Sequence, residues 1–321
     1  MRNLLREYGQ KTWVSGGQDS LDIPRDYAIN DIMLEFAGSI IVSGGTTNGT
    51  PKSFCPAGLV KQLDLRANGR DTIKSMAFED IVAQTTIRYG TLPNNTLMTS
   101  GAQATYPYYI YGIMNLAMWG TVKPFDTLFN ANPLTSLTLQ ITWGVQADLY
   151  TSVAGDRTHT ITGTLSVLGK EVVGVPSQQL FIVFKEATIN APVAASSSEF
   201  KIPLNYARDL SYRGLTLRAR VDGAEVNTVV NNIKLQSGGV IFINVNGRRL
   251  AARNKSMFSL ETWLTGFYVI DFCEDGRIGD SLDTSGLSSL DLILDVTKSG
   301  TTCEIKVITQ ELIVPTVVKS A

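Results

Sequence analysis

Four acidic residues, Asp64, Glu79, Asp209 and Glu225, are of a type that can act as a general acid or base. Catalysis by carboxyl groups needs two of them in one cleft, with the pKa of one raised by its surroundings. Nothing in their spacing brings two of them together, since each belongs to a different segment of the chain. Solvated surface carboxylates are the favoured interpretation, and the sequence predicts no catalytic residue.

The loop Asp275-Gly276-Arg277, followed by Asp280, could hold a calcium ion through carboxylate and carbonyl oxygens. Asp-Gly is also common in ordinary turns, and an ordinary turn is the favoured interpretation. The sequence leaves metal binding open and predicts no cofactor.

His159 is the only histidine, which argues against a histidine-based triad and against a multi-histidine metal site. We expect it on an exposed loop or strand. Three cysteines are too few for a disulfide framework. Cys55, Cys273 and Cys303 are expected to be free thiols in the core, with a Cys273–Cys303 disulfide as the alternative.

Composition excludes some classes of function. The chain has 321 residues and a net charge of −1, so no surface built to bind nucleic acid phosphates is expected. Charged residues make up 18% of the chain, against about 25% in an average soluble domain. The chain is either an ordinary apolar β-protein or one whose exterior is covered by neighbouring subunits. No signal peptide is visible, and no apolar run is long enough to span a bilayer.

Alternating apolar and polar residues predict mostly β-strands. In residues 59–67, Leu63, Leu65 and Ala67 take the inward phase, and Asn68-Gly69 follows as a typical type I′ hairpin turn. Further strands are expected at residues 13–24, 32–42, 137–143 and 160–175 of the first half. A short helix is expected from an apolar face that runs from Ile73 to Gln84, and polar loops are expected at residues 43–50 and 91–103.

Met1, Leu4, Leu5 and Tyr8 have the spacing of one apolar face of a helix. We therefore expect a short amphipathic N-terminal helix. It either docks on its own domain or forms an arm that touches a neighbouring subunit or a membrane surface.

Residues 106–111 contain four tyrosines and could stack sugars or bases. Basic residues do not alternate with them, so packing in a core or a subunit interface is the favoured interpretation.

Several segments of the first half return in the same order in the second half. The separation within each pair shrinks along the chain, as expected for a second copy with shorter loops. The pairs are Glu7 with Glu186, residues 21–24 with 200–203, 63–70 with 241–248, 126–128 with 280–282, 134–139 with 287–292, and Glu171 with Glu311. The sequence therefore predicts an all-β protein of two consecutive β-sandwiches, each a jelly roll, at residues 1–177 and 178–321.

This order of segments resembles a known family. It begins with Leu21-Asp22-Ile23-Pro24, continues with an apolar strand, and reaches a strand, Asn68-Gly69-Arg70 and a short helix. It is similar to the double jelly-roll major capsid proteins of icosahedral, membrane-containing bacteriophages of the corticovirus and finnlakevirus type, within the wider tectivirus and adenovirus lineage. The local match covers about residues 13–90, and the internal repeat extends it along the chain.

The resemblance implies a structural virion protein and not an enzyme. Three chains would form a homotrimeric capsomer whose six similar barrels imitate a hexagon. The loops at residues 43–58 and 91–104 would then form a tower or contacts between capsomers. The implied partners are further copies of the chain, a vertex (penton) protein and an internal lipid membrane reached by the N-terminal arm, with no sequence-specific nucleic acid binding. The implied location is the virion, assembled in the host cytoplasm.

Two alternatives use the same pair of sandwiches. A hydrolase of the peptide-N-glycosidase type would place acidic residues in a cleft between them. A tandem sugar-binding protein would use the tyrosine run.

Overall fold

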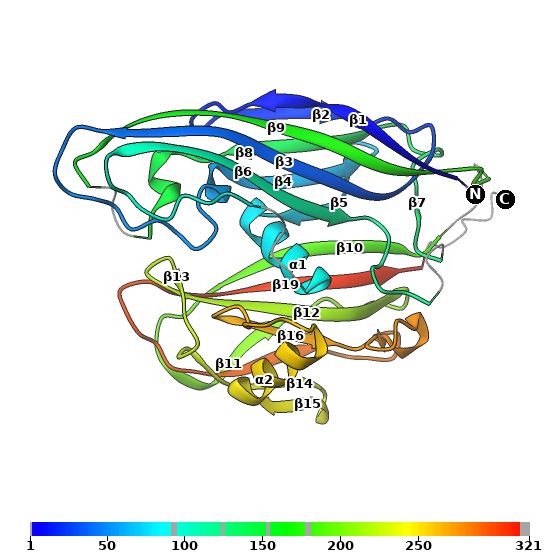
Figure 1. The fold of residues 1–321 in the computed structure, drawn as a ribbon. Helices are drawn as coiled ribbons and strands as arrows, with labels where there is room; N and C mark the ends of the chain where they lie inside the picture. Colours follow the sequence, from blue (N-terminus) through cyan, green and yellow to red (C-terminus); the bar gives the residue numbers. More distant parts are fainter. Residues whose placement is uncertain (1, 91–94, 123–125, 152–154, 177–180, 315–321) are drawn as a thin grey trace. The chain divides into compact units, whose positions relative to one another are not determined.

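The computed structural model describes residues 2–90, 95–122, 126–151, 155–176 and 181–314. By its internal contacts the chain forms two compact units (Figure 1). The first comprises Met1–Met118 and Thr127–Leu180, and the second comprises Trp119–Asp126 and Phe181–Ala321. The expected domains were residues 1–177 and 178–321. In the structure the short segment Trp119–Asp126 belongs instead to the second unit. Trp119 accounts for this, because its ring packs on Phe258 and under the guanidinium of Arg213 in the second unit.

The first unit is a pair of antiparallel sheets. Among its described residues, one sheet has the strand order β1-β9-β3-β6 and the other has the order β5-β4-β8-β2, while β7 pairs with β3. The strands are β1 (Arg2–Thr12), β2 (Gln18–Asp22), β3 (Ala28–Ser43), β4 (Val60–Ala67), β5 (Asp71–Met76), β6 (Ala104–Asn115), β7 (Phe129–Asn130), β8 (Leu137–Trp143) and β9 (Thr158–Val173). Helix α1 (Phe78–Tyr89) joins β5 to β6, and two short 3-10 turns lie at Ala57–Leu59 and Gln146–Leu149.

Strict alternation builds the core of this unit. In β8 every second residue, from Leu137 to Trp143, is buried, and the residues between them are half-buried. The ring of Phe36 on β3 lies 5.2 Å from that of Tyr108 and 6.2 Å from that of Trp143. Aromatic residues from both sheets therefore meet in the core and hold the two layers together.

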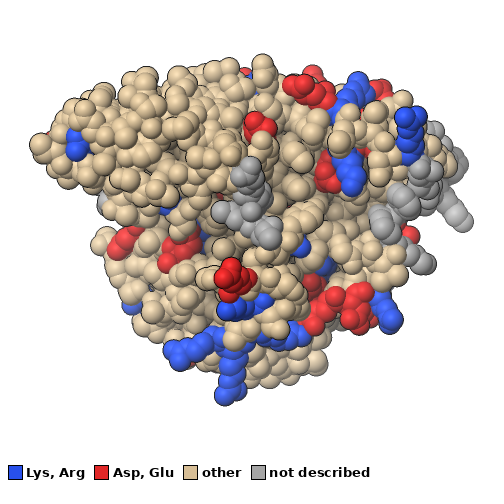
Figure 2. All heavy atoms as spheres, in the orientation of Figure 1, with Lys and Arg blue, Asp and Glu red and all other residues tan. Residues whose placement is uncertain are grey.

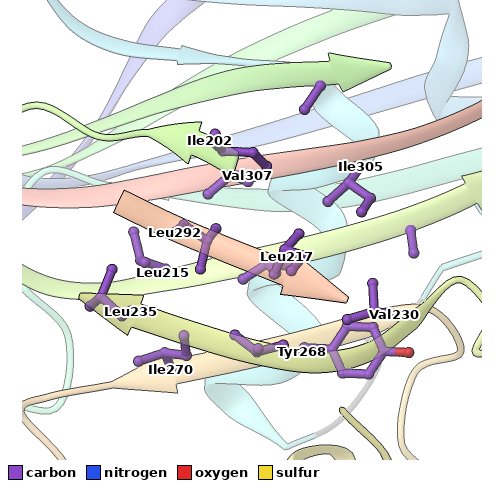
Figure 3. Packing of buried hydrophobic residues seen from close by; sticks show 14 of the residues in the cluster. Ile202, Leu215, Leu217, Val230, Leu235, Tyr268, Ile270, Leu292, Ile305 and Val307 are labelled. Carbon is purple, nitrogen blue, oxygen red and sulfur yellow. The ribbon is translucent and has the colours of Figure 1, made fainter. Parts of the chain in front are cut away.

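The second unit has the same two-sheet construction. Among the described residues, β10-β19-β12 form one sheet, in which β12 also pairs with β13, β16 and β17, and the other has the order β11-β18-β14-β15. The strands are β10 (Val183–Pro192), β11 (Ser197–Pro203), β12 (Leu210–Val221), β13 (Ala224–Glu225), β14 (Val230–Ser237), β15 (Val240–Asn246), β16 (Phe267–Asp271), β17 (Leu282–Asp283), β18 (Asp291–Val296) and β19 (Cys303–Ile313). Helix α2 (Gly247–Met257) joins β15 to β16, and a 3-10 turn lies at Ile278–Asp280. Figure 3 shows Leu215 and Leu217 of β12 in the core together with Leu235 of β14 and Leu292 of β18.

The two units share one connectivity. In each, the first, last, third and sixth long strands form one sheet, and the second, seventh, fourth and fifth form the other. A helix joins the fifth strand to the sixth in both units, and a short strand before the seventh pairs with the third. This strand order is that of a jelly roll, so the predicted double jelly roll is confirmed.

Most of the predicted repeats fall on equivalent strands. Leu21-Asp22 lies on β2 and Phe200–Pro203 on the equivalent β11. The leucine-rich segments meet β8 and β18, and Glu171 and Glu311 lie on the last strands, β9 and β19. Glu7 and Glu186 lie on the first strands. The apolar pattern of a strand persisted in these pairs because each strand keeps one face in the core.

The pairing of residues 63–70 with 241–248 is wrong. The first segment is β4 and its hairpin turn, whereas the second is β15 and the start of α2. Asn68 and Gly69 have φ values of 52° and 70°, as the predicted type I′ turn requires. Asn246 instead caps α2, since its side chain accepts hydrogen bonds from the backbone N–H groups of Arg248 and Arg249. One dipeptide thus has two different local roles.

The N-terminal helix predicted from Met1, Leu4, Leu5 and Tyr8 is wrong. Met1 is outside the described residues, and the rest of the segment is strand β1, paired with β9 from Arg2–Val173 to Thr12–Thr164. A helix of this length is marginal alone in water, and the ladder to β9 satisfies the same backbone groups through distant partners.

Two other boundaries shift. The predicted strand at residues 13–24 shortens to β2, because residues 13–17 form the connection from β1. The helix expected from Ile73 begins later, at Phe78, since Ile73 and Met76 lie on β5. The predicted loop at residues 43–50 holds no strand beyond Ser43, and residues 91–94 of the second predicted loop lie outside the described range.

An aspartate joins two connections at one end of each unit. In the first unit, the carboxylate of Asp156 accepts hydrogen bonds from the backbone N–H groups of Thr46 and Thr47 at 2.8 and 2.7 Å. In the second unit, Asp222 accepts them from Thr301 and Thr302 at 3.0 and 2.7 Å. The β3–β4 and β8–β9 connections of each unit, or their equivalents, are thereby held together.

The sixth strands are closed by the segment that precedes them. Asn254 of α2, which is fully buried, donates to the carbonyl oxygen of Val269 on β16 and accepts from its N–H, both at 2.9 Å. The side-chain amide therefore replaces a neighbouring strand. In the first unit the N–H of Ile113 on β6 donates to the hydroxyl of Thr85 on α1, and the N–H of Tyr111 donates to the side chain of Asn95.

We expect Asn254→Ala to lower the free energy of unfolding by roughly 2–3 kcal/mol, because it leaves the buried N–H and carbonyl of Val269 without a partner. Urea denaturation followed by circular dichroism measures the change. Ser256→Ala, at an exposed position of the same helix, is the matched control. Equal midpoints for the two variants would contradict the edge-closing role of Asn254.

Asp156→Asn should release Thr46 and Thr47 while the rest of the first unit stays folded. Hydrogen bonds from the N–H groups of Thr47 and Thr46 lower the pKa of Asp156, so the native state favours the charged form. The tether is therefore present above the usual aspartate pKa and is lost as the pH falls through the lowered value. Amide hydrogen exchange at neutral pH should be faster in residues 45–48 of the variant, and unchanged protection there would contradict the prediction.

Candidate assembly surfaces

The predicted acids of the first unit are held in polar contacts. Asp64 on β4 accepts hydrogen bonds from Gln62 at 3.0 Å and Ser75 at 2.8 Å, and Arg66 lies 3.4 Å from it. Glu79, in the first turn of α1, is buried, with the amine of Lys52 4.0 Å from its carboxylate. In these contacts of the described residues the partners of Asp64 are polar or cationic and the partner of Glu79 is a cation, which differs from the carboxyl pair of a hydrolytic site.

The acids of the second unit are also accounted for. The carboxylate of Glu225 lies 2.5 Å from the guanidinium of Arg218 and 3.3 Å from that of Arg220, and all three side chains are buried. Two cations favour the charged carboxylate, so this group is suited to holding β13 on β12 and not to donating a proton. Asp209 is partly exposed and contributes its backbone carbonyl to Val314.

The candidate metal loop and the three cysteines lack the features of a metal site or of an activated thiol. Within the described ranges, no group of three or more His, Cys, Asp or Glu side chains could hold a metal ion, the loop at residues 275–280 included. The three cysteines are free and buried, as predicted. Burial raises the pKa of Cys55 to about 12 and that of Cys273 to about 11, so neither thiol is activated as a nucleophile.

His159 lies on β9 with its ring hydrogen-bonded to the hydroxyl of Tyr150 and is partly buried. Burial lowers its pKa, which favours the neutral ring at physiological pH. We find no carboxylate among its hydrogen-bond partners in the described part of the chain.

A hollow on the first unit, lined by residues 22–27, 132 and 135–137, contains two carboxylates. Asp26 pairs with Arg6 at 2.7 Å, and Asp22 accepts a hydrogen bond from the hydroxyl of Thr138 at 3.1 Å. The hollow therefore presents one ion-paired carboxylate and one hydrogen-bonded carboxylate, which do not contact each other in these interactions.

The predicted tyrosine run forms β6 and divides between core and surface. Tyr108 is buried and donates to the carbonyl oxygen of Thr162, whereas Tyr109 and Tyr111 lie half-buried with ring centroids 6.0 Å apart. Alternation on one strand explains the division.

An uncharged face covers part of the first unit. On it β6, β3 and β9 lie side by side, with Thr105 paired to Ile41 and Ile41 paired to Thr160. The next row holds Ser39 and Thr162, whose hydroxyls are 3.1 Å apart. Residues 37–43, 104–111 and 158–166 contain no Asp, Glu, Lys or Arg, and Figure 2 shows few charged side chains at this end of the unit. A face of this composition suits contact with another protein.

A basic helix marks the second unit. Arg248, Arg249, Arg253 and Lys255 are exposed on α2, and Lys and Arg side chains gather over this helix in Figure 2. Glu274 pairs with Arg253 at 2.5 Å. No helix was predicted here, although the run Gly247-Arg248-Arg249 is visible in the sequence.

Two strands end their sheets with apolar side chains in solvent. On β1, Leu4 and Leu5 are 41% and 67% exposed. On β15, Val240 and Ile241 are 63% and 53% exposed. Leu4 and Leu5 were expected on a helix, and Ile241 was expected to share the inward phase of Leu63 through the predicted repeat. Alternation alone does not show which strands lie at the edge of a sheet. Within the described residues, no helix is both long and apolar enough to cross a membrane.

The comparisons with known proteins agree with this picture. Residues 186–311 match the family model "Viral coat protein P2 C-terminal domain". No curated protein matches the chain in sequence. Among solved structures, the STIV MCP is 17% identical with a TM-score of 0.79, and the match covers 98% of each chain. The major capsid protein P2 from bacteriophage PM2 is 12% identical with a TM-score of 0.65, and the match covers 99% of each chain.

A third structure, from the atomic structure of Sulfolobus Turreted Icosahedral Virus, is 16% identical with a TM-score of 0.78 and covers 98% of this chain and 92% of its own. The likeness to these structures shows a shared fold. The family model that matches residues 186–311 is that of a viral coat protein, and neither the hydrolase nor the sugar-binding alternative is supported by it. The chain thus has the double jelly-roll fold of the major capsid proteins along its length, and over residues 186–311 it carries the sequence signature of a viral coat protein domain.

Proposed function

We propose that this chain is the major capsid protein of an icosahedral virus and that it assembles as homotrimeric, pseudo-hexagonal capsomers. The observation that carries the proposal is the repetition of one eight-strand connectivity in both units of a single chain. Three such chains present six similar barrels around a three-fold axis, so that each capsomer can meet six neighbours through related contacts.

The composition of the surface supports the same proposal. An obligate interface is apolar at its core and depleted of charge. The chain provides an uncharged face on the first unit and exposed apolar side chains on an edge strand of each unit. A secreted or cytosolic monomer would gain nothing from these exposed apolar groups.

The long connections of the first unit are the proposed contacts between capsomers. The β3–β4 connection, residues 44–59, and the β8–β9 connection, residues 144–157, exceed their second-unit equivalents at residues 222–229 and 297–302. Asp156 and Arg157 join the two connections of the first unit. Asp156 accepts hydrogen bonds from Thr46 and Thr47, and Arg157 donates to the carbonyl oxygens of Gly44 and Gly45. Connections of unequal length give the two kinds of barrel different surfaces at this end, which three-fold symmetry of a capsomer permits.

The remaining partners are predictions of the resemblance. A vertex (penton) protein would fill five-fold positions that a pseudo-hexagonal capsomer cannot, and the protein would reside in the virion after assembly in the host cytoplasm. The membrane contact was predicted through an N-terminal helix, and β1 takes the place of that helix. A contact with an internal membrane would therefore have to be made by residues other than an N-terminal helix.

The purified chain should sediment as a stable trimer of three times 34.9 kDa, with larger arrays at high concentration. Sedimentation velocity over a concentration series gives the mass, and negative-stain images should show particles with a hexagonal outline. A monomer at all concentrations would contradict the proposal.

A further inference from the structure

The edges of the sheets differ in how they are protected. An unpaired strand edge offers N–H and carbonyl groups to any extended chain, and proteins normally block it with charge, proline, a bulge or a covering segment. As described above, α1 and Asn95 cover β6, and α2 covers β16. Strand β11 is an edge of the other sheet of the second unit, and it carries Lys201, Pro203 and a bulge between Ser197 and Phe200.

Strand β15, the opposite edge of that sheet, lacks charge and proline, and its one protection of this kind is a bulge at Phe242, since Ile243 pairs with Leu235 and Ile241 with Gln236. It reads Val-Ile-Phe-Ile-Asn-Val-Asn, without a charged residue or a proline. It pairs with β14, and no strand in the described residues pairs with its other side. Val240 and Ile241 remain 63% and 53% exposed. Such an edge in a native protein indicates a partner strand.

Strand β1 is the matching feature of the first unit. It pairs with β9 on one side, and no strand in the described part of the chain pairs with its other side. Its eleven residues exceed the seven of β15, so it can cover that strand along its length. Leu4 and Leu5 lie near its start and are exposed.

Symmetry chooses between the possible partners of β15. Pairing of β15 with β15 of another copy would be a two-fold contact and would close as a dimer. A three-fold assembly needs a contact between two different surfaces, repeated around a ring. Among the edge strands of the described residues, β1 is the other one with large exposed apolar side chains, Leu4 and Leu5; its charges and its bulge at Glu7–Gly9 follow in the rest of the strand, apart from Arg2.

We propose that β15 of one copy adds edge to edge onto β1 of the next copy and that this strand pairing closes the trimer. The inference rests on the proposed trimeric function and names the contact that builds it. Each first strand begins at the end of its barrel where the fourth strand turns into the fifth, and β15 begins at that turn. In upright barrels β1 and β15 would run in parallel, with Leu4 and Leu5 beside Val240 and Ile241.

Cysteine pairs test this contact directly. Leu4 or Leu5 is changed to Cys together with Val240 or Ile241, which gives four double variants that allow for a shift in register. Adjacent strands place residues within the reach of a disulfide, and the three native cysteines are buried and free. After mild oxidation, at least one double variant should yield a covalent trimer on non-reducing gels. The control pair Val14→Cys with Ile241→Cys uses a connecting residue of 56% exposure and should not.

The outcomes separate the inference from the proposed function. A trimer in sedimentation without a crosslink in any of the four variants overturns the β1–β15 pairing and leaves the capsid role intact. Covalent dimers from the single variant Ile241→Cys would show the two-fold contact and also overturn it. A monomeric wild-type chain overturns the proposed function itself.

A charge variant gives an independent readout. Ile241→Lys places an ammonium group at the proposed contact, where it would lose its hydration. The dissociation constant of the trimer should rise at least about tenfold, whereas Val14→Lys, a similar change at similar exposure, should leave it unchanged. Circular dichroism verifies that both variants fold. Equal trimer stability of the two variants contradicts the pairing.

Discussion

The closure of sheet edges is the constraint on which the rest of this structure depends. A sandwich can bury its apolar faces by itself, but each of its sheets still ends in two strands with unpaired backbone groups. The chain closes the sixth-strand edge in both units with the segment between the fifth and sixth strands. In the first unit the Thr85 hydroxyl and the Asn95 side chain accept hydrogen bonds from N–H groups of β6. In the second unit Asn254 bonds to both the N–H and the carbonyl oxygen of Val269 on β16.

A comparison of the two units shows which features of a repeated fold are constrained by burial of the core. Connectivity and the inward phase of the strands persist, because a change in either would expose a core face to water. Turn chemistry and loop length do not persist, because they are set locally. The joining of Asp156 to Thr46 and Thr47, and of Asp222 to Thr301 and Thr302, illustrates this. The same end of each barrel is fastened by one carboxylate, but the carboxylate comes from opposite connections.

The sequence predicted the fold class well, since alternation on β4 and β8 and the repeated leucine-rich segments report directly on burial. It failed where the answer depended on distant partners. Leu4, Leu5 and Tyr8 have the spacing of a helical face, but the segment pairs with β9 and forms a strand of the sheet. Ile241 has the inward phase of a strand but is exposed, because β15 lies at an edge. The candidate surfaces were beyond prediction for the same reason: strand order decides which apolar residues stay in solvent.

The placement of charge connects the fold with assembly. The second unit keeps a network of Arg218, Arg220 and Glu225 out of water, where the cost of desolvation is offset only by close pairing. The exterior of the first unit, in contrast, carries threonine, serine and isoleucine over three adjacent strands. Uncharged faces associate without removing water from ions, so they suit permanent contacts inside the proposed capsomer. The exposed arginines of α2 act through a field that salt weakens, and they therefore suit reversible contacts between the proposed capsomers.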